Sequence, residues 1–168
     1  MKVVICGAGV IGCAIAHALV RRGVQPTLVE ATMPACAASG KSGGFLALDW
    51  CDGSPMSELA RRSFALHEDL GRQFGDRTGY RRLDTLAVVA TQAPHDLSSY
   101  QKYSGPDWLN GHCAVNGLIG STDTTAQVHP RHFTRALLDE AKAGGAQYLN
   151  GRIESVEHYG GMVRGVTV

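Results

Sequence analysis

The chain has 168 residues, which is enough for one domain with a substantial buried core. Sixteen basic and fifteen acidic side chains give a formal net charge of +1, and aromatic residues make up 7%. Because no run of like charges accompanies this balance, the composition argues against a nucleic-acid-binding protein or a charged membrane-surface patch.

The N-terminal stretch resembles a signal peptide only superficially. Glycines and His17 interrupt its apolar run, and no small-residue cleavage site lies where a leader would be removed. The run is also too short and too broken for a membrane-spanning helix. We therefore expect a cytoplasmic protein with no membrane span and no nucleic-acid partner.

The cysteines and histidines do not follow a metal-binding or disulfide pattern. The cysteines are five in number and contain no C-x-x-C pair, which indicates free thiols in a reducing compartment. We expect them to be small buried hydrophobic residues. They are Cys6, Cys13, Cys36, Cys51 and Cys113. The seven histidines are scattered, and two of them flank the helix start expected in HPRH (129–132), so no metal site is predicted.

The first thirty residues contain the strongest signal in the chain. Residues 3–6 (VVIC) form a continuous apolar run, which is typical of a strand buried on both faces of a parallel sheet. A glycine-rich turn (GAGVIG, 7–12) follows, and then a helical pattern that ends at Gly23. The next strand, 27–29 (TLV), leads to Glu30. This order of strand, glycines, helix, strand and acid predicts a dinucleotide-binding unit.

Each part of this unit has a physical task. Gly7 permits the tight turn, Gly9 lets a pyrophosphate approach the backbone, and Gly12 lets the helix pack closely on the strand. The helix N-terminus offers unpaired N–H groups and a partial positive charge to the phosphates. Glu30 can accept hydrogen bonds from both ribose hydroxyls of an adenosine, and its charge would repel a 2′-phosphate, which argues against NADP.

A second glycine cluster, ACAASGKSGG at 35–44, ends like the phosphate-binding loop of nucleoside triphosphatases. However, Ala35 occupies the position of that motif's first glycine, and Gly43 and Gly44 oppose the helix that should start at the Lys-Ser pair. The stretch LALD at 46–49 lies too close to the loop to be a separate strand. The sequence therefore predicts that this loop does not belong to a triphosphatase.

Together the two glycine clusters resemble the FAD-dependent oxidoreductases of the D-amino-acid oxidase, glycine oxidase and sarcosine oxidase group. Residues 7–30 are similar to the group's N-terminal FAD fingerprint, and residues 37–47 to its second loop, where Ser39 would contact the pyrophosphate. Within the group the sequence looks closest to a little-characterised eukaryotic branch of oxidoreductases. The resemblance implies FAD, bound by Gly7, Ala8, Gly9, Val10, Ile11, Gly12, Glu30, Ala31, Ser39, Gly40, Lys41, Ser42, Gly43, Gly44 and the backbone of Ile153 at the adenine.

Later segments continue the pattern more loosely. Ser54-Pro55 predicts a helix start with proline at the first helical position. The apolar stripe that follows predicts a core-facing side formed by Met56, Leu59, Leu66, Leu70 and Phe74. Residues 79–90 resemble a strand of the group's substrate domain, with Asp84 where many members have glycine.

The last forty residues indicate a return to the cofactor domain. Pro130 opens a helix that Gly144-Gly145 ends, and residues 146–149 then form a third parallel strand. Residues 152–168 form a β-hairpin that turns at Gly160-Gly161.

We therefore predict an α/β fold with an incomplete Rossmann-like parallel sheet for FAD, an adenine-side β-hairpin and the start of a β-rich substrate domain. The expected domains are 1–78 (N-terminal part of the FAD domain), 79–125 (start of the substrate domain) and 126–168 (return to the FAD domain). Members of the group are longer, and the residues that select their substrates lie mostly outside the part that this sequence resembles. No catalytic residue is therefore assigned. Lys41 is placed either near the flavin ring or in solvent beside the phosphates.

The resemblance implies oxidation of a C–H bond next to an amine, in a small amine or amino-acid-like substrate, with dioxygen or another acceptor reoxidising the flavin. Because the sequence ends at Val168, we expect an N-terminal fragment or short isoform that is inactive alone. Two alternatives remain open. One is a fragment of an NAD-dependent dehydrogenase, which the second glycine cluster disfavours, and the other is a non-catalytic truncated cofactor-binding module.

Overall fold

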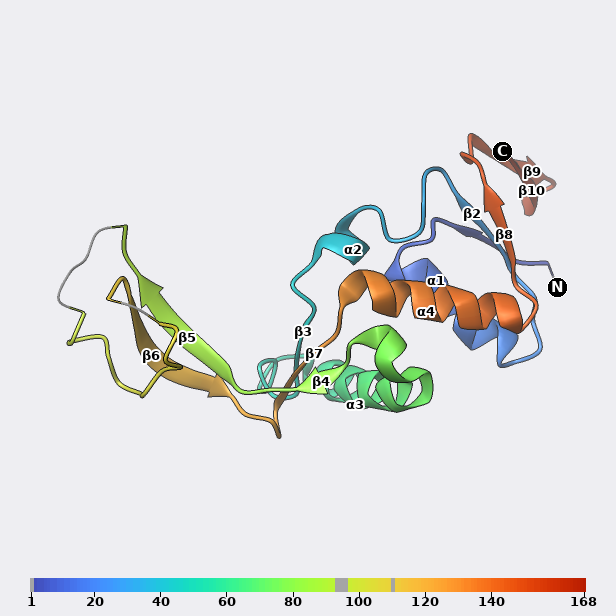
Figure 1. Ribbon diagram of the computed structural model, residues 1–168. Helices are drawn as coiled ribbons and strands as arrows, with labels where there is room; N and C mark the ends of the chain where they lie inside the picture. Colours follow the sequence, from blue (N-terminus) through green and yellow to red (C-terminus); the bar gives the residue numbers. More distant parts are fainter. Residues whose placement is uncertain (1, 93–96, 110) are drawn as a thin grey trace. The chain divides into compact units, whose positions relative to one another are not determined.

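The computed structural model describes residues 2–92, 97–109 and 111–168. The chain forms two compact units (Figure 1). Unit 1 comprises Met1–Gly44, Gly71–Gly79 and Val128–Val168, and unit 2 comprises Phe45–Leu70 and Tyr80–Gln127. Their correspondence to a cofactor domain and a substrate domain stays a prediction.

The centre of unit 1 is a three-stranded parallel sheet in the order β1-β2-β8. These strands are β1 (Val4–Cys6), β2 (Thr27–Glu30) and β8 (Gln147–Asn150). Leu28, in the middle strand, is fully buried. The parallel sheet and its third strand, which follows the last helix, confirm the predicted α/β fold.

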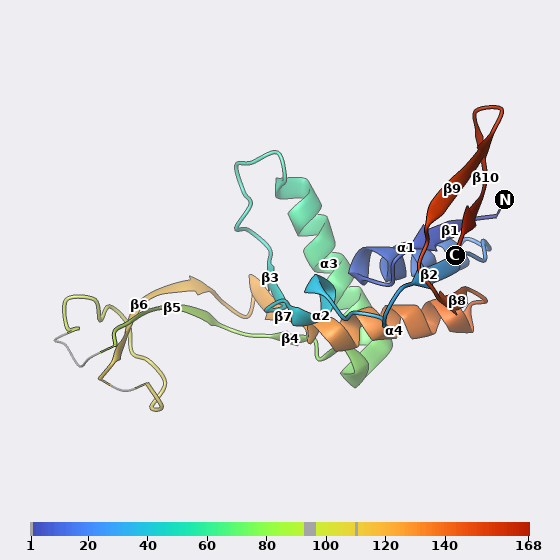
Figure 2. The same cartoon turned by 90° about the horizontal axis from the view of Figure 1, so that it is seen from above.

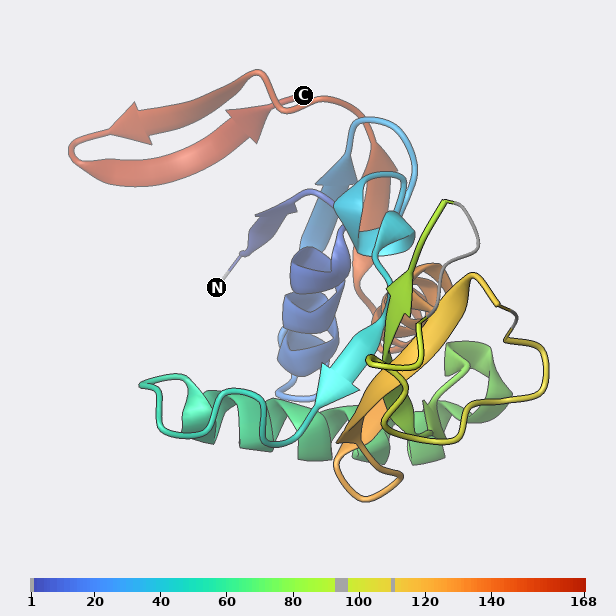
Figure 3. The same cartoon turned by 90° about the vertical axis from the view of Figure 1, so that its left-hand side faces the viewer.

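Two helices pack against each other beside this sheet, α1 (Val10–Val20) and α4 (Pro130–Ala143). Figure 3 shows α1 running alongside β1 and β2. The buried face of α1 consists of the small or flat side chains Gly12, Cys13, Ala16 and His17. Helix α4 begins at Pro130 and is followed by Gly144 and by Gly145, whose φ is 98°. Both ends of α4 lie where the sequence predicted them.

Strand β1 is only half buried, which contradicts the expectation of a strand buried on both faces. Ile5 faces the core, whereas Val4 is 41% exposed and Cys6 is also exposed. In the described part of the chain β1 pairs with β2 alone, so it forms an edge of the sheet. Next to this edge, Ile11 and Ile15 of α1 are 75% and 46% exposed.

A β-hairpin completes unit 1 and confirms the predicted one. It consists of β9 (Ser155–Tyr159) and the antiparallel β10 (Met162–Thr167), drawn in red in Figure 2. Gly160 and Gly161 form the turn with φ values of 58° and 76°. Positive φ at both central residues is the geometry that favours glycine in a two-residue hairpin turn.

Unit 2 contains two small antiparallel sheets. The first has the order β3-β7-β4, and the second pairs β5 with β6. The strands are β3 (Phe45–Ala47), β4 (Arg81–Arg82), β5 (Thr85–Ala90), β6 (Cys113–Gly120) and β7 (Thr125–Gln127).

Two expectations about these strands were wrong. The stretch after the second glycine cluster does form a strand, β3, because it pairs with β7 rather than with a local neighbour. The single strand expected over 79–90 is divided into β4 and β5, which have different partners. The division lies at Asp84, whose Oδ1 accepts a hydrogen bond from the Thr122 N–H at 3.0 Å.

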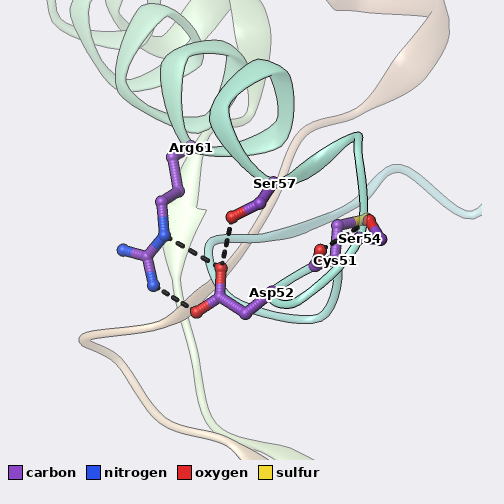
Figure 4. A network of polar contacts seen from close by, with 5 residues as sticks. All are labelled: Cys51, Asp52, Ser54, Ser57 and Arg61. Carbon is purple, nitrogen blue, oxygen red and sulfur yellow. Dashed lines mark hydrogen bonds and ion pairs between the residues drawn. The ribbon is translucent and has the colours of Figure 1, made fainter.

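The turn before helix α3 (Ser57–Phe74) is held by a side-chain network (Figure 4). Asp52 accepts hydrogen bonds from Arg61 Nε and from Ser57 Oγ, both at 2.9 Å. The Arg61 guanidinium, followed by the Ser57 hydroxyl, holds the pKa of the Asp52 carboxyl below its usual value. This network fixes the N-terminal turn of α3 from outside the helix.

Helix α3 begins two residues later than expected. The predicted capping residue, Ser54, donates its hydroxyl to Cys51 O at 2.7 Å and accepts from the Met56 N–H at 3.2 Å. These bonds close a turn that contains Pro55 and precedes the helix, so Pro55 is not its first residue. After α3 the chain forms a short 3-10 helix, Gly75–Thr78.

The apolar stripe predicted for the core along α3 is buried only at its end. Phe74 is buried and Leu70 is half-buried, but the remaining stripe residues, Met56, Leu59 and Leu66, are exposed. Phe64, which lies off the stripe, is buried instead, and the Arg82 guanidinium lies 4.5 Å above its ring. A helical period alone did not identify which side of α3 is covered.

All five cysteines lie in the described part of the chain and are free, as predicted. Only Cys13 among them is buried, which contradicts the expectation of buried hydrophobic residues. Within the described residues no three His, Cys, Asp or Glu side chains gather into a possible metal site. Over the same residues, no helix has both the length and the apolar character that crossing a bilayer would require.

Candidate functional site

The turn between β1 and α1 has a backbone geometry that requires glycine at two positions. Gly7 has a φ of 98°, and its N–H donates to Val29 O at 2.8 Å. A Cβ placed on Gly12 would lie 2.1 Å from Gly7 O, well inside van der Waals contact. The chain therefore reverses tightly at the carboxyl end of β1 and enters α1 close against the strand.

A serine from the second glycine cluster lies over this turn. Ser39, in the short helix α2 (Ala38–Lys41), accepts a hydrogen bond at Oγ from the Val10 N–H at 2.9 Å. A Cβ placed on Gly9 would come within 3.0 Å of the same Oγ. Because the first N–H groups of a helix have no partners inside it, this end of α1 suits the oxygens of a pyrophosphate. The residues present therefore fit a dinucleotide.

The loop that leads to Ser39 is held against the first turn by backbone contacts. The Ala35 N–H donates to Ala8 O at 3.1 Å, and Ala35 has a φ of 58°. Ala35, which stands where a triphosphatase loop has its first glycine, thus has the left-handed backbone conformation that glycine usually adopts. A Cβ on Gly40 would lie 1.9 Å from Ala35 O, so the chain crosses itself closely there.

The position of α2 differs from that of the helix in a triphosphatase loop. This helix ends at Lys41, and Ser42 is extended with φ −72° and ψ 165°, whereas a triphosphatase helix starts at the Lys-Ser pair. Lys41, Ser42 and Gly43 are exposed. Gly44 has a φ of 70°, and a Cβ there would lie 2.2 Å from Val128 O. Close backbone packing therefore explains the last glycine of this cluster.

Glu30 lies at the carboxyl end of β2, and backbone N–H groups hold its carboxylate. Oε2 accepts from the Ala8 N–H and Oε1 from the Thr32 N–H, each at 2.9 Å. The bond from Ala8, and then those from Thr32 and the Ala31 backbone, hold the pKa of Glu30 below its usual value despite partial burial. In the described part of the chain Glu30 makes no ion pair. The carboxylate is thus kept charged by neutral donors.

Ile153 lies near the same end of the sheet as Glu30. It is half-buried in the connection between β8 and β9, two residues after Gly151. The Gly151 N–H donates to Glu30 O at 2.9 Å, which ties this connection to the end of β2. Ligands of open α/β sheets bind at the carboxyl ends of the strands, where these residues lie.

The sequence did not indicate Thr32, which contacts Glu30, or the two residues that contact Thr32, Asn150 and Cys36. The Thr32 hydroxyl donates to Glu30 Oε1 at 3.0 Å, and the Asn150 side-chain amide donates to Thr32 O at 3.1 Å. Cys36 Sγ lies 2.9 Å from Thr32 Oγ1, within hydrogen-bonding distance. A threonine two residues after an acid is a common local hydrogen-bonding pattern, but Asn150 comes from a distant strand and leaves no local signal.

An open cavity of about 580 Å³ adjoins the turn. It is lined by residues 3–6, by Gly7, Gly9 and Gly12, by Ile11 and Ile15 of α1, and by Ser39. Its volume lies within the usual range for small-molecule and cofactor sites. The cavity continues from the N-terminus of α1 along the free edge of β1.

A family profile described as "FAD dependent oxidoreductase" matches residues 2–168. A protein of Schizosaccharomyces pombe named "Putative oxidoreductase C1F5.03c" is 33% identical over 169 residues. That alignment covers 93% of this chain and 43% of the relative.

Solved structures share the fold. Glycine oxidase from Bacillus cereus superposes with a TM-score of 0.76 at 23% identity, covering 98% of this chain and 51% of that one. L-amino acid deaminase from Proteus myxofaciens superposes with a TM-score of 0.71 at 20% identity, covering 98% and 41%. The chain thus spans about half or less of the length of these proteins.

Proposed function

Because this chain belongs to the family of FAD-dependent oxidoreductases, we propose that unit 1 holds the adenosine diphosphate half of FAD at the turn after β1. The family confirms the cofactor predicted from the sequence and removes the NAD-dependent alternative. The observation that carries the proposal is that Ser39 and Glu30 both contact the turn after β1. Ser39 Oγ accepts a hydrogen bond from the Val10 N–H, and Glu30 Oε2 accepts one from the Ala8 N–H, each at 2.9 Å.

Each part of the turn has a proposed role toward FAD. The N-terminus of α1, from Gly9 to Gly12, directs N–H groups and a partial positive charge toward the pyrophosphate. Ser39 adds a hydroxyl at the same place. Glu30 accepts a hydrogen bond from the adenosine ribose, and the backbone of Ile153 contacts the adenine. Of Gly40, Lys41, Ser42, Gly43 and Gly44, we propose that the exposed members line the path toward the flavin.

We propose further that the whole protein oxidises a C–H bond next to an amine in a small amine or amino-acid-like substrate. The names of two proteins with the same fold, glycine oxidase and L-amino acid deaminase, support this substrate class. When bound, the flavin supplies the redox chemistry. The described residues bind and orient it, and none of them is assigned a catalytic role.

Anaerobic flavin reduction tests this function. The full-length polypeptide that contains these residues is purified, its flavin is identified, and glycine, other amino acids and secondary amines are added without oxygen. We expect bound FAD and loss of its visible absorbance with at least one amine. Bound FAD that no amine reduces would favour the non-catalytic alternative, and reduction by hydroxy acids alone would contradict the amine proposal.

A further inference from the structure

We propose that Thr32 is a positioning residue for FAD, because it holds the carboxylate of Glu30 in the orientation that receives the adenosine ribose. This inference rests on the proposed function of the site. It adds a residue that none of the sequence patterns indicated and that touches the cofactor only through Glu30.

The hydrogen bonds divide the two carboxylate oxygens between the protein and the ligand. Thr32 donates twice to Oε1, from its N–H at 2.9 Å and from its hydroxyl at 3.0 Å. Ala8 donates once to Oε2, at 2.9 Å. Since each carboxylate oxygen has about two acceptor positions, the two donors of Thr32 occupy Oε1, and Oε2, which receives the bond from Ala8, is the less occupied oxygen. We therefore assign Oε2 as the atom that accepts from a ribose hydroxyl.

Thr32 is itself held in place by the neighbouring strand. The Asn150 amide donates to Thr32 O at 3.1 Å, and the Gly151 N–H donates to Glu30 O at 2.9 Å. Glu30 and Asn150 are also register partners in the parallel β2–β8 ladder. The end of β8 thus fixes the turn that carries Thr32, so the hydroxyl is aimed at Glu30 before any ligand binds.

No cation around Glu30 substitutes for these donors in the part of the chain that the structure describes. The titratable groups on which Glu30 acts electrostatically include Cys13 on α1, Cys36 beyond Thr32 and Tyr148 on β8. None of the three carries a positive charge in any protonation state. When the Cys36 thiol donates to Thr32 Oγ1, the single hydroxyl hydrogen of Thr32 is left for Glu30.

The first test compares Thr32→Val, which removes the hydroxyl but keeps the shape, with Thr32→Ser, which restores it. Both are made in the full-length polypeptide, with Thr122→Val as the control for an exposed threonine elsewhere. Binding of FAD and of FMN, which lacks the adenosine, is measured by flavin fluorescence. We expect Thr32→Val to weaken FAD binding by roughly three- to tenfold, the scale of one hydrogen bond. FMN binding should not change, and Thr32→Ser should recover FAD binding.

The second test reads Glu30 directly in the flavin-free protein. Carboxyl-carbon NMR should show a higher pKa for Glu30 in Thr32→Val than in wild type, and a restored pKa in Thr32→Ser. The inference is overturned if Thr32→Val binds FAD as tightly as wild type, if it loses as much affinity for FMN as for FAD, or if the pKa of Glu30 is the same in both proteins. Each of these results leaves the proposed function standing. Wild-type protein that binds no FAD overturns both. Thr32→Ala serves the same measurements if the valine variant does not fold.

Discussion

Ser39 and Val10 are 29 residues apart in the sequence, and the Val10 N–H donates to Ser39 Oγ at 2.9 Å. The hydroxyl of the second glycine cluster therefore caps the helix that the first glycine cluster opens. This one bond makes the two clusters parts of the same site, and it places a polar oxygen where a helix N-terminus attracts phosphate.

We expect Ser39→Ala to lower both stability and FAD affinity. The variant leaves the Val10 N–H without its acceptor, and loss of a helix cap costs about 1 kcal/mol of unfolding free energy. Urea unfolding and flavin titration measure the two effects. Ser104→Ala, at an exposed position outside the proposed site, is the control. Equal behaviour of the two variants would contradict a capping role for Ser39.

Glu30→Ala should weaken FAD binding by roughly 1–3 kcal/mol, the scale of lost hydrogen bonds to a charged group. FMN should bind as tightly as before, because it has no adenosine ribose. Glu154→Ala removes an exposed acid just beyond Ile153 and controls for net charge. An unchanged dissociation constant for FAD would remove Glu30 from the ribose.

Stability should fall with acidification through Glu30. Its pKa is lowered in the folded state, chiefly by the hydrogen bond from Ala8, so the folded protein prefers the charged form. The resulting stabilisation is complete above the usual glutamate pKa and is lost as the pH falls through the lowered value. Unfolding curves measured from roughly pH 7 to pH 3 should be less pH-dependent in Glu30→Gln than in wild type. If the unfolding free energies of Glu30→Gln and wild type changed equally with pH, Glu30 would not contribute to the pH dependence of stability.

Gly12→Ala should destabilise unit 1 although alanine favours helices. The added Cβ would lie 2.1 Å from Gly7 O and 3.2 Å from Ile5 Cγ2, so the turn or the helix must shift. We expect a loss of about 1–3 kcal/mol, as for other overpacked sites. Gly111→Ala is the control, because a Cβ there meets no atom within 4 Å. A stable Gly12→Ala variant that still binds FAD would show that the contact is easily relieved.

Residues 1–168 expressed by themselves should be weakly cooperative or aggregating, and poor in bound flavin. The free edge of β1 lies beside exposed Ile11 and Ile15, and the hairpin exposes Met162 and Val163. Such surfaces favour association of partly covered strands. Thermal unfolding with and without FAD tests this, beside the full-length polypeptide. A sharp transition above about 55 °C with stoichiometric flavin would refute the prediction.

The sequence by itself determined the order of the sheet strands, the two long helices and the hairpin of unit 1, because local sequence rules act over a few neighbouring residues. The glycines of the first turn, Pro130 at the start of α4, and Gly160-Gly161 in the hairpin impose their geometry locally. Each of these predictions was confirmed. The glycine spacing together with Glu30 also indicated the dinucleotide site.

Only the tertiary structure decided which surfaces are covered and which distant groups meet. A run of apolar residues such as that of β1 is compatible with a central strand and with an edge strand, so the sequence could not predict that one side of β1 is exposed. Pairing of β3 with β7, and the contact of Asn150 with Thr32, join residues about 80 and 118 positions apart. Such contacts arise when the chain folds back on itself and leave no periodic pattern in the sequence, which is why Thr32 was found only in the structure.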